Sequence, residues 1–218
     1  MPLFYQHTIN EDTKLAVWKI EEPENFFLTK APLQANITHP QKRLQHLAAR
    51  YLLQYLFPNF PYSQILIAPT HKPFLPNKQY YFSLSHSGNY AAAIVSAKHQ
   101  VGIDIEIAST KVLKVAHKFL NETEILNFKL PTHNLQFTTY NLQLTTLLWS
   151  SKETMLKWCG NNSIDFKKNL LLQYFNLQNE GKINATLVTG KINIPLKLQY
   201  KLLSQDLCLC WVSTKKII

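Results

Sequence analysis

One seven-residue segment constrains the fold of this chain more than any other. Residues 101–107 read Val-Gly-Ile-Asp-Ile-Glu-Ile, so a β-branched aliphatic residue stands at every odd position. The even positions are Gly102, Asp104 and Glu106. Successive side chains of a β-strand point to opposite faces, which places the aliphatic residues on one face and both carboxylates on the other. The segment therefore predicts a strand whose aliphatic face lies in a core.

The carboxylates of Asp104 and Glu106 allow two interpretations. At i and i+2 of a strand they lie about 7 Å apart and repel each other. A divalent cation between them would remove this repulsion, and hard oxygen ligands suit Mg²⁺. Gly102 leaves room on the same face. The alternative is the solvated outer face of an ordinary edge strand, and the segment alone leaves both open.

Hydrophobic periodicity elsewhere predicts both helices and hairpin strands. Asn121 followed by Glu124 fits an N-terminal capping box, and Thr38 with Pro40 fits the start of another helix. Predicted helices cover residues 44–56, 112–120 and 145–158, and predicted strands cover 15–20, 65–67, 80–96 as a hairpin, 171–176, 183–189, 192–200 and 207–213. Because the strands come in hairpins, an α+β fold is favoured over a doubly wound parallel sheet.

Composition limits the class of protein. The chain has 218 residues, 46% of them hydrophobic, which excludes a disordered chain. No run approaches the ~20 apolar residues that span a bilayer, and glycine-rich phosphate-binding loops are absent. Three cysteines do not suggest a disulfide scaffold, so a cytoplasmic location is expected. The formal net charge of +10 predicts an anionic partner, such as nucleic acid, a phosphate ligand, a membrane surface or an acidic protein.

A second candidate site lies on the predicted helix 145–158. Glu153 and Lys157 are at i and i+4 and share a helix face with Trp149, one turn earlier. The simplest interpretation is a surface ion pair, which contributes roughly 0.2–0.5 kcal/mol. In the functional interpretation, Glu153 is a third oxygen ligand and Lys157 is a phosphate-binding cation.

A third candidate site is the Ser85-His86 pair in the predicted hairpin. Neighbouring residues project differently, which argues against a nucleophile–base pair. At the end of a strand, a hydroxyl, an imidazole and backbone N–H groups can instead hold a phosphate. The alternative is a polar hairpin turn.

Together, the three segments resemble the 4′-phosphopantetheinyl transferase superfamily in its longer, surfactin-synthetase-activating form. The matching motifs, in order, are Phe-Ser-Leu-Ser-His-Ser at 82–87, Val-Gly-Ile-Asp-Ile-Glu at 101–106 and Trp-Ser-Ser-Lys-Glu-Thr-Met-Leu-Lys at 149–157. Lys72-Pro73 ahead of the hairpin also matches. Two residues depart from the family pattern: Thr154, where Ala or Ser is usual, and His71, where Gly is common.

This resemblance implies a fold of two similar α+β halves in one chain, related by pseudo-twofold symmetry, with coenzyme A in the cleft between them. The N-terminal half would cover residues 1–107, contact the phosphates and adenosine of coenzyme A, and end in the metal strand. The C-terminal half would cover residues 108–218 and contain the catalytic helix 145–158 and a strand meander. With both halves in one chain, a monomer is expected.

The resemblance also implies a reaction. Family members transfer 4′-phosphopantetheine from coenzyme A to a serine of an apo acyl or peptidyl carrier protein and release 3′,5′-ADP. The implied Mg²⁺ ligands are Asp104, Glu106 and Glu153, and the implied catalytic residues are Glu153, Lys157 and Asp104. The implied contacts to coenzyme A are Arg43, Lys72, Pro73, Ser85, His86, Lys152 and Lys157. The residues that hold the 3′-phosphate in the family are poorly matched near the N-terminus, and Lys30 and Lys42 compete with Arg43 for this role. The positive charge suits both coenzyme A and an acidic carrier, so neither nucleic acid nor a membrane is expected as a partner.

Two other classes of protein share some of these features. A metal-dependent nuclease also combines clustered carboxylates with a lysine on a basic surface, but the lysine expected after Asp104-Ile105-Glu106 on a nuclease strand is missing. A non-catalytic nucleic-acid-binding protein would expose aromatic residues among basic ones. Here aromatic residues such as Tyr51 and Tyr55 occupy core positions of the helical pattern.

Overall fold

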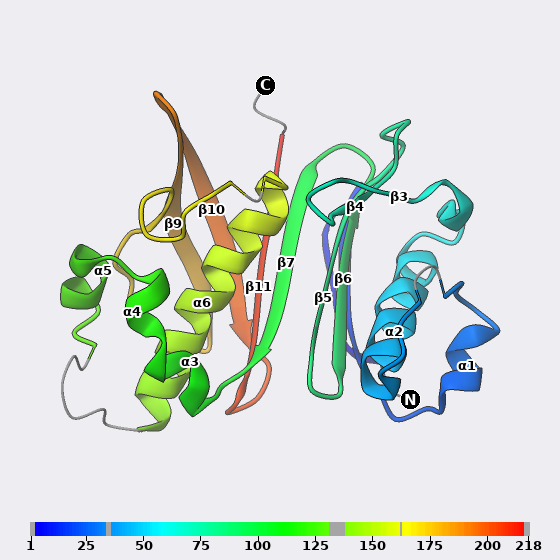
Figure 1. Cartoon of the computed structure of the whole chain (residues 1–218), viewed down its shortest axis with the longest axis horizontal. Helices are drawn as coiled ribbons and strands as arrows, with labels where there is room; N and C mark the ends of the chain where they lie inside the picture. The colour runs from blue at the N-terminus through cyan, green and yellow to red at the C-terminus, as the bar shows by residue number, and fades with distance from the viewer. Residues whose placement is uncertain (1–2, 34–35, 131–137, 162, 216–218) are drawn as a thin grey trace. The chain divides into compact units, whose positions relative to one another are not determined.

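The computed structural model describes residues 3–33, 36–130, 138–161 and 163–215. The chain divides into two compact units, Met1–Ile105 with Ser213–Lys216 and Glu106–Val212 with Ile217–Ile218. Both units combine helices with antiparallel strands (Figure 1). The α+β class is therefore confirmed, and the pseudo-twofold relation between two halves stays a prediction.

The first unit is a four-stranded antiparallel sheet covered by one long helix. The sheet has the order β1-β2-β6-β5, formed by β1 (Leu3–Asn10), β2 (Thr13–Lys19), β6 (Tyr90–Ser96) and β5 (Tyr81–Ser87). The smaller elements are α1 (Glu24–Leu28), a 3₁₀ turn at Tyr62–Gln64, β3 (Leu66–Ile67) and β4 (Pro73–Phe74). Helix α2 (Pro40–Leu56) packs on β2, β5 and β6 and buries Leu47, Leu52 and Leu53 against them.

Most local predictions for this unit hold, with three differences. Helix α2 begins at Pro40, and its N-cap is His39 rather than Thr38. The hairpin turn is only Gly88-Asn89, because β5 continues through Ser87. Strand β1 was not predicted, since it pairs only with β2 and alternates between half-buried and exposed residues.

The second large sheet has the order β7-β11-β10-β9-β8. Its strands are β7 (Gln100–Ile107), β8 (Leu170–Leu172), β9 (Glu180–Thr189), β10 (Ile192–Leu202) and β11 (Leu207–Thr214). The helices are α3 (Thr110–Lys114), α4 (Ala116–Phe119), α5 (Glu122–Asn127) and α6 (Thr139–Cys159). Helix α6 contacts α3, α4 and β8 (Figure 1), and its buried residues share a core with the sheet.

The sequence signals located some of the ends of these helices. Asn121 caps α5 in a capping box with Glu124, as predicted. Helix α6 begins earlier than predicted, at Thr139, and ends at Gly160, whose φ of 71° lies in the left-handed region that favours glycine. In the ranges that the structure describes, no helix is both long and apolar enough to cross a membrane.

Candidate functional site

The carboxylate of Asp104 is buried, not solvated. Only 2% of the residue is exposed, and its Oδ1 accepts a hydrogen bond of 2.8 Å from the Ser85 hydroxyl on β5. The interpretation of this strand face as an ordinary solvated edge is therefore wrong at Asp104. A carboxylate is costly to bury without partners, so the hydrogen bond from Ser85 helps to keep it there.

Two serine hydroxyls connect β5 to β7. The Ser85 hydroxyl also accepts a hydrogen bond of 3.2 Å from the backbone N–H of Ile105. The Ser83 hydroxyl accepts a hydrogen bond of the same length from the backbone N–H of Ile103. Both serines are buried, as are Ile103 and Ile105. The two serine hydroxyls thus accept hydrogen bonds from backbone N–H groups of β7, as backbone carbonyls of a neighbouring strand do inside a sheet. These bonds fix the position of Asp104 on β7.

Glu106, the next residue on the same strand face, is half-buried in the second unit. Its Oε1 accepts a hydrogen bond of 3.4 Å from the indole Nε1 of Trp149 on α6. The Trp149 ring stacks on Phe166 at 5.3 Å between centroids and meets Phe119 nearly edge-on at 5.1 Å. Packed aromatic neighbours restrict the rotation of the indole and so define the direction of its N–H group.

Glu153 and Lys157 occupy the positions on α6 that the sequence predicted. They are separated by one helical turn, and both are half-buried. Their burial is higher than expected of a fully solvated surface pair. Their roles as a metal ligand and a phosphate-binding cation stay predictions.

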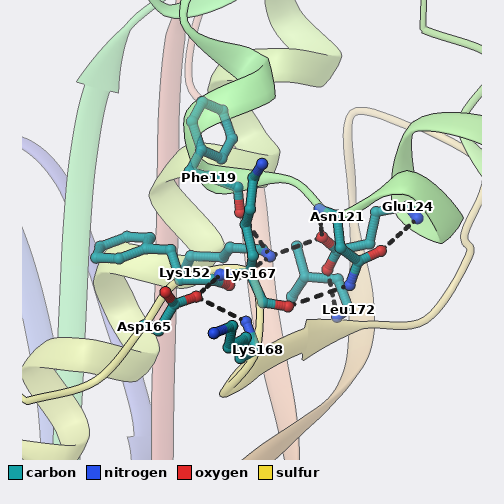
Figure 2. A network of polar contacts seen from close by, with 9 residues as sticks. Phe119, Asn121, Glu124, Lys152, Asp165, Lys167, Lys168 and Leu172 are labelled. Carbon is teal, nitrogen blue, oxygen red and sulfur yellow. Dashed lines mark hydrogen bonds and ion pairs between the residues drawn. The ribbon is translucent and has the colours of Figure 1, made fainter.

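Lys152 has a different environment from the one expected of a contact to coenzyme A. Its side chain is fully buried, and the ammonium donates to Glu124 Oε2 at 2.7 Å and to the carbonyls of Phe119 and Phe166 at 2.9 and 2.8 Å (Figure 2). An ammonium has three N–H groups, and all three are used here. This environment argues against the prediction that Lys152 binds coenzyme A.

The helical pattern around Lys152 contained a signal for this burial. Lys152 lies one turn after Leu148 and one turn before Met155, both fully buried. A lysine on an apolar helix face needs a buried acceptor. The sequence did not show which acidic residue supplied it, because Glu124 is 28 residues away.

A polar group on α2, not predicted from the sequence, faces the Ser-His-Ser strand. Arg50 is buried and donates from Nη1 to Nδ1 of His46 at 3.1 Å. Because a guanidinium can only donate, the neutral imidazole carries its proton on Nε2. Burial, together with the charges of Arg50 and His86, lowers the pKa of His46 to about 4. Burial also lowers the pKa of Arg50 to about 10, which leaves it cationic at neutral pH.

The remaining predicted contacts to coenzyme A lie in the first unit. Arg43 forms an ion pair with Glu24, for which a phosphate would have to compete. Lys72 and Pro73 follow a turn in which His71 has a φ of 62°, and this explains why glycine is common at that position in the family. His86 is exposed on β5 next to the buried Ser85.

The carboxylates of Asp104 and Glu106 on β7 have the chemistry that a hard divalent cation prefers. Asp104 and Glu106 each receive a hydrogen bond from a neighbouring side chain, the kind of support that orients metal-ligating carboxylates. Mg²⁺ is commonly held by one or two carboxylates, together with water and phosphate oxygens. Among the described residues, no three His, Cys, Asp or Glu side chains gather closely enough to hold a metal, so Glu153 stays a predicted third ligand.

Comparison with known proteins points to one superfamily. No family model matches the chain. A search of curated proteins finds the 4′-phosphopantetheinyl transferase gsp of Aneurinibacillus migulanus, which is 33% identical over 116 residues. The match covers 52% of this chain and 45% of that protein, so it spans about half the length of each. This similarity supports a relationship to the 4′-phosphopantetheinyl transferase superfamily, while the surfactin-synthetase-activating subtype stays a prediction.

Replacement of Ser85 by alanine tests the support of Asp104. We expect Ser85→Ala to lower the free energy of unfolding by about 1–3 kcal/mol, because a buried carboxylate and a backbone N–H both lose a partner. Ser83→Ala is the matched control, since Ser83 is also buried and, among the described residues, its hydroxyl accepts from the backbone N–H of Ile103 and has no bond to Asp104. Urea denaturation should show a smaller loss for Ser83→Ala. Equal losses would mean that the bond to Asp104 contributes nothing.

The lowered pKa of His46 predicts a pH-dependent stability. The pKa of this group is about 4 in the folded protein and 6.5 as its model value. As the pH falls below about 6.5, the unfolded chain therefore takes up the proton first, and the free energy of unfolding decreases until about pH 4. Urea denaturation across this range should show a flatter slope for His46→Gln. The control is His39→Gln, a change of the exposed N-cap residue of the same helix, which should keep the wild-type slope.

Proposed function

We propose that this protein is a 4′-phosphopantetheinyl transferase that modifies a serine of an apo acyl or peptidyl carrier protein. One observation carries the proposal: hydrogen bonds link motif residues that are distant in the sequence. Ser85 donates to Asp104, and Trp149 donates to Glu106, two residues further along β7. The similarity to a curated 4′-phosphopantetheinyl transferase supports the same conclusion.

In the proposed reaction, the hydroxyl oxygen of the carrier serine forms a bond to the phosphorus that bears the pantetheine group of coenzyme A. The bond from this phosphorus to the bridging oxygen breaks, and 3′,5′-ADP leaves. Glu153 would accept the serine proton, directly or through water. Lys157 would stabilise the charge that develops on the leaving oxygen.

We assign the motif residues to different parts of coenzyme A and its metal ion. Ser85 and His86 would face the phosphates, Lys72 and Pro73 the adenosine end, and Lys157 the pyrophosphate. Asp104 and Glu106 would hold Mg²⁺, which, when bound, neutralises the charge of the pyrophosphate. The net charge of +10 suits an acidic carrier protein, because complementary charge accelerates encounter.

Mass spectrometry of an apo carrier incubated with this protein, coenzyme A and Mg²⁺ tests the reaction. We expect the carrier serine to gain one 4′-phosphopantetheine group and 3′,5′-ADP to accumulate. Asp104→Asn and Glu106→Gln should each abolish the modification, because a neutral amide is a poorer ligand for Mg²⁺. Glu11→Gln, a change of an exposed carboxylate, is the control and should retain activity. Full activity of either β7 variant at saturating Mg²⁺ would contradict the metal assignment.

Lys157→Met separates a catalytic role from a surface ion pair. The substitution keeps an unbranched side chain and removes the charge, so packing should survive and the melting temperature should change by only a few degrees. Loss of a cation that stabilises the transition state should lower kcat by about 10²–10³-fold, with a smaller change in KM for coenzyme A. Lys168→Met, at an exposed position, should retain wild-type kcat. Near-wild-type turnover of Lys157→Met would remove this lysine from the mechanism.

A further inference from the structure

The buried ammonium of Lys152 lies where three segments of the second unit meet. It binds the carbonyl of Phe119 at the end of α4, the carboxylate of Glu124 on α5 and the carbonyl of Phe166 in the segment after α6 (Figure 2). Lys152 thus connects α6 to two segments of backbone that are far from it in the sequence.

Glu124 is itself fixed from several directions. Its Oε1 accepts a hydrogen bond from the backbone N–H of Leu172 on β8. Its Oε2 accepts hydrogen bonds from the backbone N–H of Asn121 and from the ammonium of Lys152, and all three bonds are 2.7–2.9 Å long (Figure 2). Asn121 in turn donates to the carbonyl of Lys167, at 3.3 Å. The partner of the ammonium is therefore held by backbone groups and cannot move without breaking a strand contact and a helix cap.

Stability alone does not explain a buried charge at this position. Burial lowers the pKa of Lys152 despite the opposing effect of Glu124, which reflects the cost of removing the ammonium from water. Well-packed hydrophobic residues of similar volume are often as stable as a buried ion pair, or more so. What an ammonium adds is three directed hydrogen bonds, and two of these go to backbone carbonyls.

Those two carbonyls belong to the residues whose rings enclose Trp149. The Phe166 ring stacks on the indole with an interplanar angle of 11°, and the Phe119 ring meets it at 68°. Trp149 lies on α6 one turn before Lys152. The same side chain therefore sets the backbone positions from which both rings reach the indole.

The indole of Trp149 connects these backbone positions to β7 through a hydrogen bond. Its Nε1–H donates to Glu106 Oε1 at 3.4 Å, and Glu106 is half-buried. We propose that Lys152 is a positioning residue for Glu106, acting through the backbone of Phe119 and Phe166 and the indole of Trp149. The inference deepens the proposed function, in which Glu106 is a ligand of Mg²⁺, and it assigns Lys152 no contact with a substrate.

The test uses a double variant, Lys152→Met with Glu124→Gln, which removes the ammonium without leaving a buried carboxylate unpaired. The first measurement is the NMR signal of the Trp149 indole N–H in the full chain without metal, identified by its loss in Trp149→Phe. We expect the signal to shift in the double variant and in Glu106→Gln. Lys168→Met is the matched control, because only the backbone N–H of Lys168 enters the network, and the signal should not move.

The second measurement is the Mg²⁺ dependence of turnover. Loss of a group that orients a metal ligand typically weakens metal affinity by 10–100-fold, so the KM for Mg²⁺ should rise by about this factor in the double variant and in Trp149→Phe. The KM for coenzyme A should change much less, because neither Lys152 nor Trp149 touches it in the proposed site. A purely structural role would lower the melting temperature and leave both the indole signal and the KM for Mg²⁺ unchanged, and this result would overturn the inference.

Phe166→Leu keeps the inference testable if the double variant does not fold. It removes the ring that stacks on Trp149 but retains the carbonyl that binds Lys152, so the indole signal should shift in a folded protein. An unchanged signal in this variant would equally overturn the inference. If the wild-type protein transfers no phosphopantetheine, the proposed function fails, and the indole measurement still decides whether Lys152 positions Trp149.

Discussion

The ion pair between Lys152 and Glu124 is the interaction on which the second unit depends most. It joins α6, the α4–α5 connection and the first strand of the β8–β9 pair through groups that are almost completely excluded from water. A buried charge tolerates little displacement of its partners, because each lost hydrogen bond leaves a desolvated group unsatisfied. The segments that meet at Lys152 are therefore fixed relative to one another within this unit.

Adjacent residues of helix α6 have different environments: Lys152 is buried, and Glu153 is half-buried. Successive residues of an α-helix project about 100° apart, so Lys152 points into the unit while Glu153 and Lys157 are only half-buried. Burial of Lys152 anchors the helix, while Lys157 lies on a face that is partly exposed. In the first unit, the serines of β5 have a comparable role, since their hydroxyls satisfy both the backbone of β7 and the buried carboxylate of Asp104.

Sequence analysis was most successful where structure depends on neighbours in the chain. The alternation at 101–107 predicted β7, and the Asn121–Glu124 pair predicted a capping box. It failed where local signals were weak. Strand β1 has no continuous apolar pattern because it lies at a sheet edge, and the predicted helix after Thr110 is broken at Val115, whose backbone leaves helical geometry.

The sequence by itself determined the types of most elements, the three motifs and the carboxylates that the motifs contain, because periodicity and spacing are local properties of the chain. Only the tertiary structure decided which of these residues are buried and what they contact. Ser85 meets Asp104 across 19 residues, Lys152 meets Glu124 across 28, and Trp149 meets Glu106 across 43. Such pairs form only when folding brings distant segments together, and the low polarity of the interior then makes each hydrogen bond hard to replace. For this reason, Lys152 looked like a ligand of coenzyme A in the sequence and is an internal anchor in the folded unit.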